Sequence, residues 1–314
     1  MIDYNAIPKG QIGVDDEEFD TEAPNYPHGD IGQVRMVCQY SHMTKDDPLV
    51  FPGQPGAAHL HAFFGNTLTD AFSTADSLRN TGASTCYGGT LNRSAYWVPV
   101  LIDANGIPQR AVQGNFYYKA GYELPSSSIQ PFPTGLRMIA GSAASSSPQP
   151  VGVADFGCDG GTMRCPDGVG GNLPYWCSAI PSCGKGARIV QHVGFPQCWD
   201  GKNLDSPDHK SHMAYPVDGA CPADHPVAIP HIEFLIEYVQ PGDSTAGWHL
   251  SSDMYDQSMP GGFSGHGDYF SGWKQEMIDT FVRRCDQLSL NCGDGPIGDG
   301  RVLTNKHTWD PFPN

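Results

Sequence analysis

The chain has 314 residues, and its 34 acidic side chains against 18 basic ones give a formal net charge of −16. This charge repels nucleic acid and anionic membrane surfaces, so we expect neither as a partner, and no stretch is apolar enough for membrane insertion. The 38 glycines and 27 prolines predict many turns and little helix.

Ten cysteines, an even number, predict five disulfides and an oxidising compartment. No CxxC motif is present, which disfavours a structural zinc site. Met1 is followed directly by polar residues, and we interpret the chain as the mature form of a secreted, extracellular protein. The spacing leaves the connectivity open, and proximity favours Cys158/Cys165, Cys177/Cys183, Cys198/Cys221, Cys285/Cys292 and Cys38/Cys86.

Residues 1–30 are predicted to form an acidic N-terminal extension, because they show no strand or helix period and carry a cluster of acidic side chains at 15–20. Residues 31–314 are expected to form a single catalytic or binding domain, since no low-complexity linker divides them. The first strand of this domain is predicted at 33–38.

The next stretch places His59 and His61 two residues apart between turn-forming Pro-Gly and Gly-Asn pairs. Residues of this spacing on a strand project from one face, so both imidazoles can converge on a metal or a substrate. A solvated pair without function is the alternative.

Several further stretches predict strands of a mainly β fold. Residues 94–103 are apolar on both faces, as in a strand buried between two layers, and 110–118 and 136–140 follow as strands. Residues 231–239 alternate, with Glu233 beside a histidine on the polar face. Together they predict a sandwich or jelly-roll-like core, from which 157–187 leave as a long loop held by disulfides.

The stretch 198–233 is the richest in polar chemistry, and its prolines exclude a long helix. We predict an ordered loop in which His209 and His212 face together in one helical turn. Asp205 and Asp208 are its candidate catalytic carboxylates. A surface loop whose polar groups only cap its own backbone is the alternative.

A third cluster follows near the C-terminus, where His266 and Asp268 repeat the two-residue spacing of one strand face. The single predicted helix comes next, at 272–288, with Ser271 as its N-cap and apolar residues at helical spacing.

The order of these pieces resembles a family of secreted proteins known only as domain of unknown function 1996. The residues that carry the resemblance are Cys38, the His59-Leu60-His61 segment with Gly65-Asn66, the stretches CWDGKNLDSPDHKSHMAYP and CPADHPVAIP, LSSDMYD, and GHGDYFSGW before the helix. The resemblance implies secretion and a common core but no reaction. It also implies that one site gathers His59, His61, His209, His212, His266 and Asp268.

The leading functional hypothesis is a secreted enzyme that cleaves glycosidic bonds of a polysaccharide, as a hydrolase or a lyase. An acidic, aromatic-rich β protein with carboxylates beside histidines suits such work, because one carboxyl can act as acid and a second as base or nucleophile. The candidate acids and bases are Asp205, Asp208, Glu233 and Asp268, with His59, His61, His209, His212 and His266 in the same cleft.

Two alternatives remain open. A divalent metal, zinc or copper or iron, could be held by His59 and His61 together with His209, His212 or His266 and with Asp268, in an extracellular metal-dependent enzyme. A non-catalytic module that binds cell-wall glycan through exposed aromatic side chains is the other.

Overall fold

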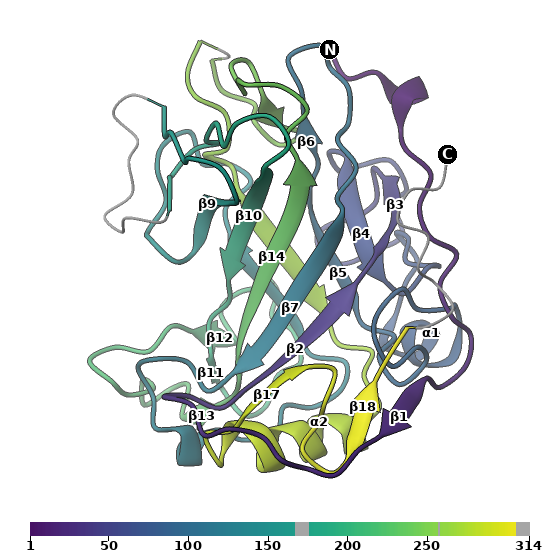
Figure 1. Ribbon diagram of the computed structural model, residues 1–314, viewed down its shortest axis with the longest axis vertical. Coiled ribbons are helices and arrows are strands. Elements are labelled where there is room, and N and C mark those ends of the chain that lie inside the picture. The colour runs from purple at the N-terminus through teal and green to yellow at the C-terminus, as the bar shows by residue number, and fades with distance from the viewer. Residues whose placement is uncertain (167–175, 257, 306–314) are drawn as a thin grey trace.

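The structure is a computed structural model that describes residues 1–166, 176–256 and 258–305. Strands dominate it, which confirms the predicted mainly β class (Figure 1). The strands are β1 (Phe19–Thr21), β2 (Gln33–Cys38), β3 (Tyr40–Thr44), β4 (His61–Gly65), β5 (Ala95–Pro99), β6 (Leu101–Ile102), β7 (Gln113–Lys119), β8 (Arg137–Gly141), β9 (Ala154–Asp159), β10 (Arg188–Gly194), β11 (Cys198–Trp199), β12 (Met213–Ala214), β13 (Val227–Ala228), β14 (His231–Val239), β15 (His249–Leu250), β16 (His266–Phe270), β17 (Asn291–Asp294) and β18 (Arg301–Leu303).

Two sheets carry the fold. One has six strands in the order β17-β2-β7-β14-β10-β9, and the other has five in the order β3-β4-β5-β16-β8. Neighbouring strands are antiparallel except β17 and β2, which run parallel. The pairs β1-β18 and β15-β6 and the short sheet β12-β11-β13 lie outside them.

The core fills the space between these two sheets. Phe116 and Phe234 of the six-stranded sheet pack against Tyr96 of β5, with ring centroids 4.0 and 5.6 Å from that of Tyr96. All three side chains are fully buried, as the alternation in their strands predicts. The arrangement is the sandwich expected from the sequence.

The opposite, outer face of the five-stranded sheet is also buried. A second apolar cluster, Leu49, Phe63, Leu78, Ala95, Trp97 and Phe270, lies there, because the chain between β3 and β5 folds back over this face. Strand side chains that point away from the sandwich core are therefore covered by loops. The candidate site described below lies on this face.

The helices differ from the prediction. The C-terminal helix α2 spans Gln275–Phe281 and continues as a π-helical turn, Val282–Asp286, so it begins three residues after the predicted start and its N-cap is Lys274 instead of Ser271. A six-residue helix, α1 (Ala75–Asn80), was not predicted. Thr74 and Ser77 stabilise its first turn with a reciprocal capping box. Single-turn 3-10 helices occur at Tyr4–Ala6 and Ser126–Ser128.

All ten cysteines form disulfides, as predicted, and three of the five pairings are those favoured by proximity: Cys38–Cys86, Cys198–Cys221 and Cys285–Cys292. The other two pairings were wrong. Cys158 bonds Cys183 and Cys165 bonds Cys177, a nested arrangement. The reason is that Phe156 of β9 pairs with Cys177 by backbone hydrogen bonds, so the two arms of the 157–187 loop lie side by side in this register.

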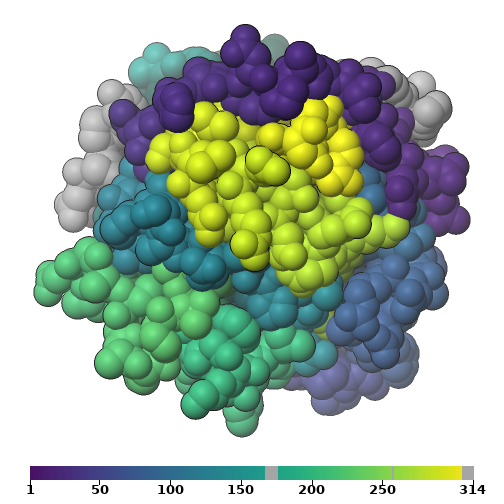
Figure 2. Space-filling view, turned by 90° about the horizontal axis from the view of Figure 1, so that it is seen from below, coloured from purple at the N-terminus to yellow at the C-terminus, as the bar shows by residue number. Residues whose placement is uncertain are grey.

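The N-terminal segment lies along the C-terminal one. β1 pairs with β18, and His28 forms a bridge with Leu290. Figure 2 shows the N-terminal residues bordering the surface formed by the C-terminal part of the chain. Within the described residues, no helix has the length and apolar character that crossing a membrane requires.

Candidate metal centre

His61 and His266 begin strands β4 and β16 and both point to the outer face of the five-stranded sheet. β5 lies between these strands, with His61 paired to Pro99 and Asp268 paired to Trp97. Continuing the second register by two residues brings His266 level with Pro99. The two imidazoles approach each other across β5, with ring centroids 5.8 Å apart.

A backbone carbonyl holds each of these two rings by one nitrogen. Nδ1 of His61 donates to the carbonyl of Asp46 at 3.0 Å, and Nδ1 of His266 donates to the carbonyl of Ser264 at 2.8 Å. A carbonyl only accepts, so the proton is on Nδ1 and the lone pair is on Nε2 in both rings. This tautomer, anchored from behind, is the one that metal-ligating histidines adopt.

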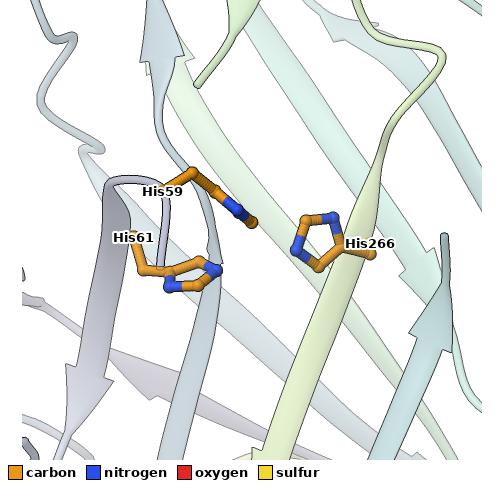
Figure 3. A group of neighbouring side chains, drawn as sticks. All are labelled: His59, His61 and His266. Atoms are coloured by element: carbon orange, nitrogen blue, oxygen red, sulfur yellow. The ribbon is translucent and has the colours of Figure 1, made fainter. Parts of the chain in front are cut away.

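His59 completes a group of three imidazoles. Its ring centroid lies 4.1 Å from that of His61 and 5.0 Å from that of His266, and Figure 3 shows the three rings turned toward one space. One nitrogen from each ring lies within 4.8 Å of the others. Nε2 of His59 and Nε2 of His61 are buried without a hydrogen-bond partner in the described part of the chain.

Two carboxylates adjoin these rings. Asp268 projects from the same face of β16 as His266, with its Oδ2 3.9 Å from Nε2 of His266, and that oxygen has no hydrogen-bond partner among the described residues. Asp47 lies in the loop after β3, where its Oδ1 accepts from the backbone N–H groups of Leu49 and Val50. Ligand atoms of Asp47, His61 and Asp268 also lie within 4.8 Å of one another.

Burial shifts the pKa values of these histidines and of Asp268. It lowers the pKa of His61 to about 3 and of His266 to about 4, and it lowers the pKa of His59 further, helped by the neighbouring rings. Burial also raises the pKa of Asp268 well above its usual value, with Asp47 adding to the effect. The rings are thus neutral donors at ordinary pH, whereas the Asp268 carboxyl keeps its proton until a cation compensates its charge.

The loop 199–213 covers this face of the sheet from the side of β8. The backbone N–H of Arg137 donates to the carbonyl of Leu204, and the Lys210 ammonium donates to the carbonyl of Gly141 at 2.6 Å. Gly141 is the register partner of His266. The loop therefore brings both of its candidate histidines to the β8 edge of the sheet, but in different settings.

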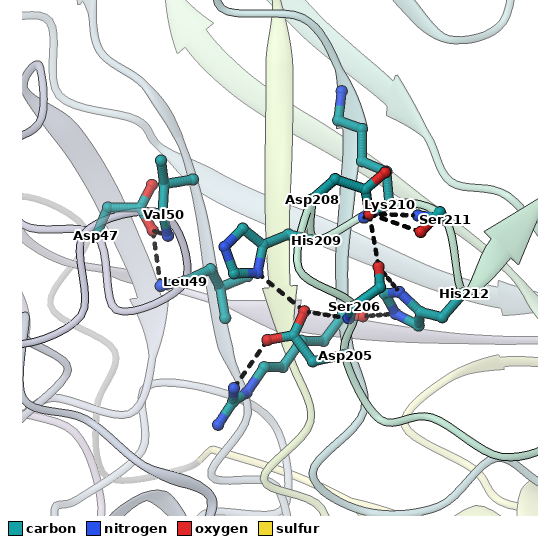
Figure 4. Close-up of polar contacts among 11 residues, drawn as sticks. Asp47, Leu49, Val50, Asp205, Ser206, Asp208, His209, Lys210, Ser211 and His212 are labelled. Atoms are coloured by element: carbon teal, nitrogen blue, oxygen red, sulfur yellow. Dashed lines mark hydrogen bonds and ion pairs between the residues drawn. The ribbon is translucent and has the colours of Figure 1, made fainter.

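His209 lies beside Asp47 and bonds Asp205, as Figure 4 shows. His212 is buried, and both of its ring nitrogens are occupied: Nδ1 by the Ser206 hydroxyl at 2.9 Å and Nε2 by the carbonyl of Arg137 at 2.7 Å. These bonds give His212 a structural role and leave no lone pair for a metal. The predicted helical turn does not form, because residues 206–212 make irregular turns with His209 at φ 59°, and the two rings have different partners.

The remaining candidate carboxylates serve other roles. Asp208 caps its own turn, accepting from the backbone and hydroxyl of Ser211 and from the Ser206 hydroxyl. Glu233 lies on the six-stranded sheet, where it pairs with Lys119 at 2.6 Å and with His231 at 3.1 Å. Neither belongs to the group of ligand atoms around His61.

Sequence reasoning missed Asp47. It belongs to an Asp-Asp-Pro turn whose only visible role was to end a strand. Its position fourteen residues before His61 carries no periodic signal, because the chain returns to this face through an irregular loop. The only available sign was an acidic residue close in sequence to the paired histidines.

Comparison with protein families finds a match to a family described as a domain of unknown function (DUF1996), over residues 47–273. No curated protein and no solved structure matches the chain. The matched region runs from Asp47 to Trp273 and so includes the three converging histidines and both carboxylates. The chain therefore belongs to the DUF1996 family, as the resemblance of its motifs indicated.

Proposed function

We propose that this protein binds one divalent transition-metal ion through His59, His61 and His266, with Asp268 as an oxygen donor, and that it is an extracellular metal-dependent enzyme. The observation that carries the proposal is the convergence of Nε2 lone pairs whose rings are fixed from behind by backbone carbonyls.

The energetics support a bound cation. A buried polar atom left without a hydrogen bond costs about 1–3 kcal/mol, and here Nε2 of His59, Nε2 of His61 and Oδ2 of Asp268 are all in that state. His61 belongs both to the group of ligand atoms with His59 and to the group with Asp268. Three such atoms in two adjoining groups are unfavourable for a purely structural core. A metal ion compensates all three, because each is an electron-pair donor.

The donor set limits the metal. Imidazole nitrogens with one carboxylate suit zinc, copper or iron, whereas calcium and magnesium prefer shells of oxygen. A bound ion of this kind polarises an oxygen of the substrate or lowers the pKa of a bound water. The chain's own contribution is to hold the rings in one tautomer and to keep the site under a cover of loops.

The metal hypothesis is better supported than a glycosidase that uses two carboxylates. Such an enzyme needs an acid and a base on either side of the bond, about 5–9.5 Å apart. Of the four predicted carboxylates, Asp205 is paired with Arg137, Asp208 caps a turn and Glu233 is paired on the other sheet. Polysaccharide as the substrate, and glycan binding without catalysis, stay predictions from the sequence.

Metal analysis of protein purified without a histidine tag tests the proposal. We expect about one ion per chain in the wild type, and a loss of affinity beyond the ~10–100-fold typical of outer partners in His61→Ala and His266→Ala. His225→Ala is the matched control, because His225 bonds Asp224 and the carbonyl of Ser211. Equal metal content in all four proteins, or none in the wild type, would refute the site.

A further inference from the structure

Beside the three histidines lies a second polar arrangement, a chain of contacts from Arg137 through Asp205 to His209. Oδ2 of Asp205 accepts from the Arg137 guanidinium at 2.9 Å, and Oδ1 accepts from Nδ1 of His209 at 2.9 Å. Although burial favours the neutral acid, the bonds from His209 and Arg137 lower the pKa of Asp205 below its usual value. Asp205 is therefore an anion held between two donors.

These contacts fix the orientation of the His209 ring. A carboxylate only accepts, so the proton is on Nδ1 and the lone pair is on Nε2. The ring is partly exposed, and no hydrogen bond to Nε2 occurs within the ranges that the structure describes. His212, three residues later, has both nitrogens occupied, so the open lone pair is specific to His209.

The backbone of His209 adopts the left-handed conformation, with φ 59°. This region costs a non-glycine residue roughly 1 kcal/mol or more, and it concentrates at functional sites. The turn is closed by the bond from the His209 N–H to the carbonyl of Ser206 and by Asp208, whose Oδ1 accepts from the N–H groups of Lys210 and Ser211. The bonds of its own turn thus maintain the left-handed conformation of His209.

The ring lies on the side of the Asp47 loop, as Figure 4 shows, with Asp205 on its other side. Burial raises the pKa of Asp47, and the nearby His209 opposes this rise. Asp47 in turn offers a carboxylate oxygen within 4.8 Å of ligand atoms of His61 and Asp268. The charged groups drawn around the ring are thus Asp47, Asp205 with its partner Arg137 and, beyond Asp208, Lys210.

Resting on the function proposed above, we propose that His209 is the general base of the metal site and that Asp205 positions it. The O–H bond of a water at the site breaks, its proton forms an N–H bond at Nε2, and the oxygen keeps the electron pair. The resulting imidazolium is balanced by the Asp205 carboxylate, which Arg137 holds in place. This division of roles is that of a histidine oriented by a carboxylate in other hydrolytic sites.

Cobalt(II) provides a probe that requires no substrate, because its visible absorption responds to ionisation at and near its ligands. We compare the wild type with His209→Asn, which tolerates the left-handed backbone but has no basic nitrogen, and with Asp205→Asn. All three proteins are expected to bind one cobalt ion with similar affinity. We expect the wild type to show a pH-dependent spectral transition that His209→Asn loses and that moves in Asp205→Asn, because the imidazolium loses its counter-ion.

The outcomes separate the two proposals. Failure of the wild type to bind cobalt overturns both. Normal binding with the same transition in His209→Asn leaves the metal site intact and overturns the role of His209. An unchanged midpoint in Asp205→Asn shows that this carboxylate does not act through the ring. Loss of cobalt binding in His209→Asn, with the fold intact by circular dichroism, makes His209 a ligand and also overturns its role as base.

Discussion

At the scale of single residues, the histidines of this protein differ by what holds each ring nitrogen. His42 resembles His212, since its two nitrogens meet the Ser41 hydroxyl and the carbonyl of Thr69. In His61 and His266, Nδ1 donates a hydrogen bond to a backbone carbonyl, and Nε2 is left without such a bond. Burial alone therefore does not distinguish a structural histidine from a ligand, and the state of the second nitrogen does.

The opposite pKa shifts in the site predict how many protons a metal displaces. At about pH 5.5 the rings are already neutral, because the pKa values of His61 and His266 are lowered to about 3 and about 4. Burial, with Asp47 adding to the effect, raises the pKa of Asp268 well above its usual value, so Asp268 is the group that we expect to hold a proton before metal binding. Zinc binding should therefore release about one proton per ion from Asp268, and Asp268→Asn should remove that release.

Calorimetry of zinc binding in two buffers of different protonation enthalpy measures this release. The control is Asp208→Asn, because Asp208 lies outside the ligand group and caps a turn. Release of two or three protons by the wild type would contradict the expectation, since it would mean that the histidines are charged in the metal-free protein.

At the scale of elements, the C-terminal helix ends in a buried carboxylic acid. Asp286 ends the π-helical turn, is fully buried, and neither carboxylate oxygen has a hydrogen-bond partner in the part of the chain that is described. Desolvation raises its pKa well above the usual value. A folded-state pKa above the unfolded one means that stability is fully present below the unfolded pKa and is lost as pH rises through the folded pKa.

Asp286→Asn should therefore stabilise the protein at neutral pH by about 1–3 kcal/mol, because it removes the charge that burial penalises. The gain should disappear near pH ~4, where the wild-type carboxyl is also neutral. Urea unfolding at both pH values measures this. Glu276→Gln on the exposed side of α2 is the control and should change stability little. A gain of equal size at both pH values would argue against ionisation as the cause.

At the scale of the whole molecule, the site joins segments that are distant in the chain. The loop after β3 supplies Asp47 and the segment before β4 supplies His59, while β16 supplies His266 and Asp268 more than two hundred residues later. A ligand held by several segments at once binds the folded state and not the unfolded one. Metal binding should then stabilise the entire fold.

We expect zinc to raise the thermal midpoint of the wild type progressively with concentration, corresponding to about 2.7 kcal/mol at 100 times the dissociation constant. A chelator should reverse the shift. His61→Ala should show no shift, whereas His225→Ala should behave as the wild type. Differential scanning calorimetry at several zinc concentrations gives the answer, and equal shifts in all proteins would place the ion elsewhere.

The sequence by itself determined those features that depend on local periodicity and composition. Sequence patterns marked strands at 33–38, 94–103, 110–118, 136–140 and 231–239, whereas β3, β9, β10 and β17 were not predicted. The two-residue spacing of His266 with Asp268 indicated a shared strand face, because strand side chains repeat every two residues. His59 precedes β4, so it approaches His61 without the predicted strand geometry. The even cysteine count likewise indicated an oxidising environment, and all ten cysteines are bonded.

Only the tertiary structure decided which of these faces meet. Periodicity states that two residues share a face but not which strands are neighbours. The strand order β4-β5-β16 brings His266 to His61. The hydrogen bonds of the 199–213 loop occupy both nitrogens of His212, and the β9 register decides the nested disulfides. Each of these choices depends on contacts between segments far apart in the chain, and local sequence patterns carry no information about them.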